Sequence, residues 1–279
     1  MRRAYTIVTD AFDRFVADDG WAIASHIALS VLMALFPFFI VLTALAGLFG
    51  SADLTNQVAR LVFATWPAEV AEPIVREVRQ VLGGTHPGTL TIGIVFALYF
   101  ASSGVESLRI GLNRAYGQTE TRNWIVLRLE SIGYVLLAAL ALLALAFLVV
   151  LGPLLFRAAL LHAPWLEPLE GTVTFARFGV ATVVLVVALF VAHKWLPAGR
   201  RRIIEILPGL AATLLLWLGA GIGFGRYLSE FSSAYVSYYA GLASVMIALV
   251  FLYWTASIFL YGGALNTAIF RPRVEPAVP

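Results

Sequence analysis

Residues 131–156, SIGYVLLAALALLALAFLVVLGPLLF, run for 26 positions without a charged side chain. At a rise of about 1.5 Å per residue, a helix of this length measures about 39 Å, which exceeds the roughly 30 Å hydrocarbon core of a bilayer. The stretch therefore predicts a helix that crosses a membrane.

The rest of the chain repeats this pattern. Charged residues make up only 13% of the 279 residues and the mean hydropathy is +0.88, whereas soluble domains carry about 25% charged residues. Continuous apolar runs, without the alternation of β-barrel strands, predict an all-α polytopic membrane protein that forms a single integral membrane domain over 1–279. The six transmembrane helices are expected near 27–49, 89–105, 131–155, 175–195, 206–224 and 243–268.

The orientation in the membrane follows from the basic residues, because short cytoplasmic loops carry an excess of Lys and Arg. With six spans, 13 of the 19 basic residues fall on the side that holds both termini. We therefore expect both termini in the cytoplasm. The pI near 9.3 then reflects this topology and not affinity for nucleic acid.

Two segments outside the spans have helical periodicity. Apolar residues within 1–25 recur at helical spacing opposite charged ones, which predicts either a helix lying in the cytoplasmic interface or a helix docked on the ends of the bundle. Residues 51–88 show the same spacing, punctuated by Pro67 and Pro73. We expect two short amphipathic helices there, which form an extracytoplasmic cap.

Three residues are candidate hinges. Pro37 interrupts the first span, and Pro208-Gly209 opens the fifth; a proline inside a helix removes a hydrogen bond and can kink it. Static packing is the alternative for each. The glycines at 219, 221, 223 and 225 favour close helix packing over a functional break. The uncharged Ser- and Tyr-rich segment 231–241 is expected to be a re-entrant or interfacial entry to the sixth span.

A polar stripe is predicted at the cytoplasmic end of the second span. Ser102, Glu106, Arg109 and Asn113 stand at i, i+4, i+7 and i+11, so they share one helix face. Charges inside a membrane are costly, so the stripe should face the bundle interior with Glu106 and Arg109 paired. The pair is either a binding or gating element, or a structural ion pair.

Further polar residues could join this cluster on the cytoplasmic side. Arg114 follows the stripe, and Asn266 lies near the same end of the sixth span. His26 and Glu205, at the starts of the first and fifth spans, could also join it, although residence in the interface is the simpler expectation.

Several short motifs resemble the YihY family, also called virulence factor BrkB and historically labelled ribonuclease BN. They cover nearly the whole chain: HIALS at 26–30, ALFP at 34–37, SG at 103–104, LNRAYG at 112–117, WLP at 195–197, LPG at 207–209, YL at 227–228 and GALN at 263–266. The resemblance implies a six-span protein of the bacterial inner membrane. The chain departs from the family's usual Ala-Tyr at His26-Ile27, and has Ala264 where the family usually has Glu, so a mechanism that needs that carboxylate lacks its residue.

No catalytic site, metal site or cofactor is expected. The four histidines are scattered without ligand spacing, cysteine is absent, and no phosphate-binding glycine motif occurs. A ribonuclease, which needs positioned acid–base groups or a metal, is therefore not favoured, and nucleic acid is not an expected partner.

Two functional classes remain. The first is a transporter or lipid-translocating protein for an anionic lipid or solute, in which Arg109 and Arg114 meet the anionic group. The second is a non-transporting scaffold for envelope integrity. Membrane lipids are the expected partners at the basic loops, with a homo-oligomer or an envelope protein as further candidates.

Overall fold

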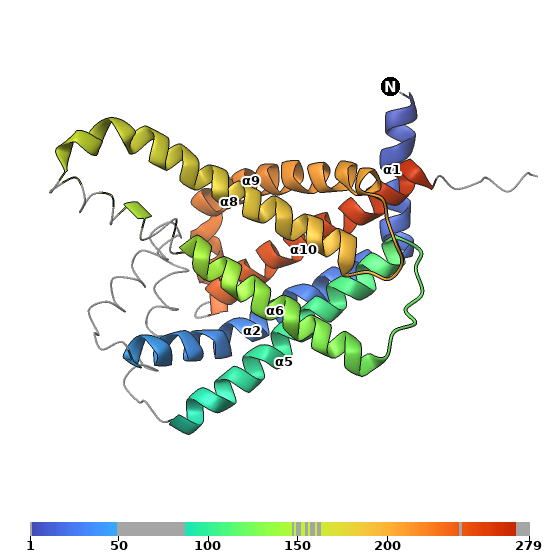
Figure 1. Cartoon of the computed structure of the whole chain (residues 1–279). Helices are drawn as coiled ribbons and strands as arrows, with labels where there is room; N and C mark the ends of the chain where they lie inside the picture. The colour runs from blue at the N-terminus through green and yellow to red at the C-terminus, as the bar shows by residue number, and fades with distance from the viewer. Residues whose placement is uncertain are drawn as a thin grey trace, which may run out of the picture.

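The computed structural model describes residues 2–48, 87–146, 163–239 and 242–271, with isolated residues between 148 and 160 (Figure 1). Every regular element within these ranges is helical. The long helices are α1 (Arg2–Ala17), α2 (Gly20–Leu48), α5 (Pro87–Ala115), α6 (Trp124–Ala146), α8 (Glu170–Trp195), α9 (Leu207–Tyr239) and α10 (Ala243–Phe270). Two short 3₁₀ helices, η2 (Pro164–Leu169) and η3 (Ile203–Glu205), precede α8 and α9.

Five stretches of the described residues are long and apolar enough to cross a membrane: Thr91–Ala115, Trp124–Leu142, Trp165–Trp195, Ile203–Glu230 and Ala243–Phe270. Arg3–Ala17 and Gly20–Leu35 pass the same test together, bent by 66°, so there are up to six spans. The prediction of an all-α polytopic membrane protein is thus confirmed.

The long helices after α1 run in alternating directions along the chain, and each of them starts or ends at the same end of the bundle. Contacts between helix termini define this end: His26 near the start of α2 lies against Ser107 of α5, and Gly209 at the start of α9 lies against Asn266 near the end of α10. α1 crosses the same end (Figure 1). We call it the α1 end.

Helix α10 is the centre of the bundle, where it packs against α1, α2, α5 and α9. Small residues on its last turns allow this, since Gly263 lies against Leu112 and Ala115 of α5. The largest cluster of buried apolar side chains surrounds this region and includes residues of α1, α2, α5, α8, α9 and α10. The core therefore lies close to the α1 end.

Helices α6 and α8 lie at the periphery. Large apolar side chains along both remain exposed, among them Leu137 and Leu140 on α6 and Phe175 and Val183 on α8. A surface this apolar is unusual on a soluble protein, and it is the surface expected of a helix in contact with lipid acyl chains.

Of the two arrangements that its sequence left open, helix α1 has the docked one. Its Phe15 is buried, α1 packs against α10, and Arg14 Nη2 donates a hydrogen bond to the Arg271 carbonyl oxygen at 2.9 Å. On its other face Tyr5, Val8 and Phe12 are exposed, Tyr5 at 74%. α1 is therefore docked on the bundle and still presents an apolar face suited to a membrane interface.

Three predicted segments differ from the structure or lie outside the described residues. Residues 20–25 belong to α2 and not to the N-terminal helix. The segment 231–241, expected as a re-entrant or interfacial entry to the sixth span, is helical up to Tyr239, as the continuation of α9. Both helices simply extend beyond their most apolar stretches. The expected cap at 51–88 lies outside the described residues, except for 87–88, which begin α5.

Candidate functional site

Six charged side chains at the α1 end of α5 and α6 form one continuous chain of ion pairs, which we call the ion network. Glu106 lies 2.9 Å from Arg128 and 3.3 Å from Arg109. Glu120 lies 3.9 Å from Arg109 and 2.9 Å from Arg122, and Arg122 lies 2.8 Å from Glu130. Opposite charges alternate along the chain, so its three cations and three anions balance.

Arg109 is the most buried member of this network, with 2% of its surface exposed. Besides its two carboxylate partners, its Nη1 donates to the Leu127 carbonyl oxygen and to Ser131 Oγ, each at 3.2 Å. A buried guanidinium is tolerable only when it is paired and hydrogen-bonded, and Arg109 meets both conditions. Its partners come from α5, α6 and the loop between them, so it joins these elements.

The loop between α5 and α6 is held by Glu120. The side-chain hydrogen bond from Arg122 lowers the pKa of Glu120 to about 2, and Asn113 Nδ2 donates to the same carboxylate at 3.2 Å. The reciprocal effect of Glu120 raises the pKa of Arg122. Arg122 Nη2 also donates to the Leu196 carbonyl oxygen at 3.2 Å, which connects this loop to the loop after α8.

A second group of polar residues lies deeper at the α1 end, and we call it the hydrogen-bonded core. The Gly209 N–H donates to Asn266 Oδ1 at 2.6 Å, and Asn266 Nδ2 lies 3.0 Å from Tyr116 Oη. Tyr116 Oη lies 2.9 Å from His193 Nδ1. His193 is fully buried, and its other ring nitrogen, Nε2, has no hydrogen-bond partner among the described residues.

The start of α9 explains why Asn266 is needed. The first N–H groups of a helix have no partner within the helix, and here Asn266 of α10 caps the Gly209 N–H from across the interface. The two helices touch closely: a Cβ added to Gly209 would collide with the Gly262 carbonyl oxygen and the Asn266 amide. Gly209 is thus a packing and capping position.

The predicted polar stripe is interior, as its spacing indicates. Ser102, Arg109 and Asn113 are buried, and Glu106 is half-buried. Asn113 joins two elements, because its Oδ1 accepts a hydrogen bond from the Ala198 N–H at 2.7 Å while its Nδ2 reaches the ion network. Ser102 donates to the Tyr99 carbonyl oxygen of its own helix.

Other predicted members of the cluster are elsewhere. Arg114 is exposed and pairs with Asp19 at 2.7 Å, away from the ion network. Asn266 belongs to the hydrogen-bonded core. His26 and Glu205 do not join Glu106 and Arg109: His26 Nδ1 lies 2.6 Å from Ser107 Oγ, and Glu205 accepts a hydrogen bond from the Arg202 N–H.

Among the buried polar residues that sequence reasoning missed are Tyr116, His193 and Arg201. Arg201 stacks over the Tyr116 ring at 4.5 Å, and its Nη atoms donate to the carbonyl oxygens of Ala198 and Pro197. Burial raises the pKa of Tyr116 to about 12. Each of the three lies next to a turn. Polar residues near turns are expected to be exposed to solvent, so no local pattern indicated that these side chains are buried.

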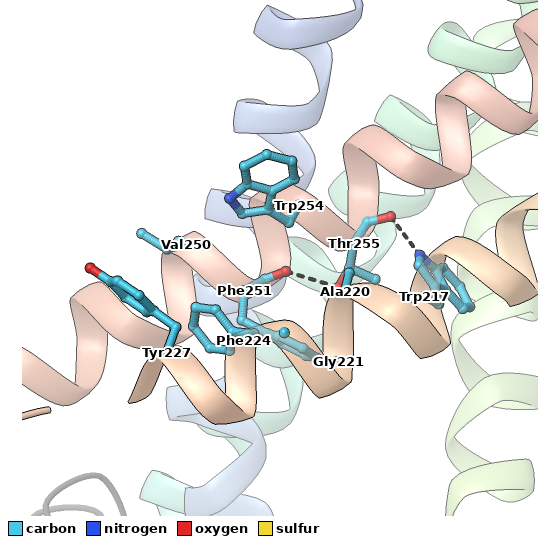
Figure 2. Close-up of a pocket in the computed structure, with 10 residues that line it drawn as sticks. Trp217, Ala220, Gly221, Phe224, Tyr227, Val250, Phe251, Trp254 and Thr255 are labelled. Carbon is cyan, nitrogen blue, oxygen red and sulfur yellow. Dashed lines mark hydrogen bonds between the residues drawn. The ribbon is translucent and has the colours of Figure 1, made fainter. Parts of the chain in front are cut away.

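A groove opens between α9 and α10, away from the ion network (Figure 2). Its volume is about 600 Å³, and its lining is apolar and aromatic. The Trp217 indole N–H is already used, because it donates to the Thr255 carbonyl oxygen at 3.0 Å. Gly221 and Gly223 lie on the α9 side, and a Cβ added to either would meet no atom within 4 Å. The groove is therefore open above these glycines.

The described residues contain no group of three or more His, Asp or Glu side chains arranged to hold a metal ion. Pro208 lies in the first turn of α9, and the backbone of α2 is helical through Pro37.

The virulence factor BrkB family model matches residues 11–277 of this chain. A putative ribonuclease-like protein, YfkH of Bacillus subtilis, is 23% identical over 271 residues, which cover 97% of this chain and 98% of that protein. UPF0761 membrane proteins of Rhodospirillum centenum and Kangiella koreensis are 26% and 24% identical over 95% of this chain. The chain spans only 58% and 64% of their lengths. No solved structure matches.

Proposed function

The chain belongs to the virulence factor BrkB family, and on that premise we propose that this integral membrane protein moves anionic lipid between the leaflets of the bacterial inner membrane. In this proposal the α1 end faces the cytoplasm, because most of the basic residues gather there. The α9–α10 groove holds the acyl chains while the headgroup crosses.

The groove is the observation that carries the proposal. It lies on two helices whose composition suits a membrane, and its volume of about 600 Å³ is in the range of sites for small organic ligands. Exposed Phe251 and Trp254 stand at its rim, so the opening is toward the surface that acyl chains would cover. An apolar, surface-open groove suits an acyl chain better than a charged solute.

The ion network has a different part in this proposal. Arg109 was expected to meet the anionic group, but its donors are directed to Glu106, Glu120, Leu127 and Ser131. Turning it toward a substrate would break its contacts with Glu106 and Glu120 and its hydrogen bonds to Leu127 and Ser131, at a cost for a guanidinium that is 2% exposed. Arg109 therefore braces α5 against α6 and the loop between them.

The test is lipid translocation in proteoliposomes, measured by the chemical quenching of a fluorescent phosphatidylglycerol in each leaflet. Gly221→Leu and Gly223→Leu place a large side chain in the groove, so we expect rates near those of protein-free vesicles. The matched control is Gly133→Leu on α6, where a Cβ also meets no atom within 4 Å. This control should retain the rate of the unaltered chain.

Two outcomes would refute the proposal. One is an unaltered chain that translocates no faster than protein-free vesicles. The other is a chain whose rate the two groove variants leave unchanged. Circular dichroism and size-exclusion chromatography of each variant separate a blocked groove from a protein that failed to fold.

The alternative function is a non-transporting scaffold that supports envelope integrity. The closed, charge-balanced ion network favours it, because that end of the bundle is built as a fixed frame. Translocation equal to that of empty vesicles would favour the scaffold. Ribonuclease activity, suggested only by the name of the Bacillus subtilis relative, is not part of either proposal.

A further inference from the structure

In the part of the chain that the structure describes, Arg201 is a buried cation without an ion-pair partner. Only 6% of its surface is exposed, and its Nε is buried with no hydrogen-bond partner. Within the described residues no carboxylate lies within 4.0 Å of its guanidinium. This contrasts with Arg109, which has two carboxylate partners at the same end of the bundle. Buried charges are normally paired, so an unpaired one calls for an explanation.

Further cations lie beside Arg201. Arg271, directly after α10, donates from Nη1 to the Tyr116 carbonyl oxygen at 3.3 Å and lines the same small pocket as Arg201. Lys194 Nζ donates to the Arg201 carbonyl oxygen. Burial lowers the pKa of Arg201, and repulsion from Arg271 lowers it further. Like charges held this close favour any anion that can lie between them.

The pocket contains one carboxylate, that of Glu205. Glu205 Oε2 accepts a hydrogen bond from the Arg202 N–H at 3.1 Å, where it caps the short helix η3. It moderates the positive charge of the pocket but makes no ion pair within 4.0 Å of Arg201 or Arg271 in the described part of the chain. Two guanidinium groups thus face one carboxylate that is already engaged.

The space inside the pocket is small. Its volume is about 20 Å³, which is room for roughly one water molecule or one oxygen atom of a larger group. A tetrahedral anion at the mouth could place one oxygen inside, toward Arg201, and leave its other oxygens near Arg271. Planar guanidinium groups match the oxygens of a phosphate in this way.

We propose that the pocket between Arg201 and Arg271 binds a phosphate group at the α1 end of the bundle. The phosphate comes either from a phospholipid headgroup or from free inorganic phosphate. In its lipid form the inference rests on the proposed function, because the site would then hold the headgroup of an anionic lipid at one membrane face. Helix α1 crosses the same end (Figure 1). Its exposed side chains Tyr5, Val8 and Phe12 are apolar, which is consistent with headgroup depth.

The experiment measures binding and not translocation. Purified full-length protein in detergent is titrated with inorganic phosphate, against chloride at equal ionic strength, and thermal unfolding reports saturation. A second arm places the protein in nanodiscs of phosphatidylcholine with increasing phosphatidylglycerol. Saturable stabilisation by phosphate assigns free phosphate, while saturable stabilisation by phosphatidylglycerol alone assigns the lipid headgroup.

The decisive variant is Arg271→Gln, because Arg271 is exposed and its loss should leave the fold intact. We expect binding to weaken about tenfold, the effect of losing one charge-assisted contact. The control is Arg200→Gln, which removes the same charge from an exposed residue of the neighbouring loop that does not line the pocket. It should change the affinity less than about twofold.

Two outcomes overturn the inference: no saturable stabilisation in either arm, or equal weakening by Arg271→Gln and Arg200→Gln, which would mean a diffuse surface charge effect. The result is independent of the groove, because Gly221→Leu should retain phosphate binding. Loss of translocation with binding intact, or the reverse, shows which of the two proposals has failed.

Discussion

Helix α9 carries glycines in two regions that use them in opposite ways. At the α1 end, Gly209 lies so close to Gly262 of α10 that a side chain on either would strike the other helix. Two to four turns further along, Gly219, Gly221 and Gly223 have no atom within 4 Å of an added Cβ. The same residue type thus closes one interface and leaves a groove open in the other.

The two regions also differ in their polar groups. At the α1 end the ion network balances its charges, and the hydrogen-bonded core links Gly209, Asn266, Tyr116 and His193 through side-chain contacts. The groove is aromatic and apolar. The comparison teaches that the ion-paired residues between α5 and α6 support the frame, while the larger space for a ligand, the α9–α10 groove, has no charged lining residue.

The largest effect is expected from Arg109→Leu. This change removes the buried cation that joins Glu106 and Glu120 together with its hydrogen bonds to α6. We expect a loss of about 3 kcal/mol in the free energy of unfolding, at the low end for a broken buried pair, because the two carboxylates keep Arg128 and Arg122. Unfolding in detergent micelles measures it. The control is Arg114→Leu, which breaks the exposed pair with Asp19 and should cost less than about 1 kcal/mol. Equal losses would show that the network does not brace the α1 end.

The next effect is a pH dependence from Glu120. Its pKa is lowered from 4.5 to about 2, so its contribution is complete above pH 4.5 and is lost as the pH falls toward 2. The corresponding loss is about 2–3 kcal/mol after allowance for its partial exposure. Thermal unfolding at pH 5, 4, 3 and 2 should show this slope in the unaltered chain.

Glu120→Gln tests the assignment. The amide cannot titrate, so its stability should be lower at pH 5 and should fall less between pH 5 and 2. A variant with the same slope as the unaltered chain would assign the acid sensitivity to another carboxylate.

A smaller effect is expected from Tyr116→Phe. Without the hydroxyl, Asn266 Nδ2 and His193 Nδ1 lose a partner in a buried site, which costs about 1–3 kcal/mol. The matched control is Tyr5→Phe, at an exposed position of α1. It should change the free energy of unfolding by no more than about 0.5 kcal/mol. If the two variants unfold alike, the hydrogen-bonded core does not contribute to stability.

The smallest effect should be a gain. Gly219→Ala fills open space and improves helix propensity, so we expect stabilisation by about 0.5–1 kcal/mol. The same substitution at Gly209 should destabilise, because its methyl group would meet the Gly262 carbonyl oxygen. Thermal unfolding of the two variants side by side provides the comparison. If both substitutions stabilise the protein, or both destabilise it, the two regions of α9 do not differ as described.

The sequence alone determined the fold class and the interior position of the stripe on α5. Uncharged runs near 26 residues leave few alternatives to membrane-crossing helices, since a backbone in lipid must satisfy its own hydrogen bonds. The spacing from Ser102 to Asn113 likewise placed Glu106 beside Arg109, because side chains three and four residues apart are neighbours on a helix. These are local consequences of helical geometry.

Only the tertiary structure decided which polar residues meet across helices. Asn266 contacts Gly209, 57 residues away, and Tyr116 contacts His193, 77 residues away, and no local spacing encodes either contact. The role of each α9 glycine also depends on whether α10 lies against it or diverges from it. The open groove and the unpaired Arg201 follow from how the helices cross, because burial and partners are properties of neighbours that a linear sequence does not specify.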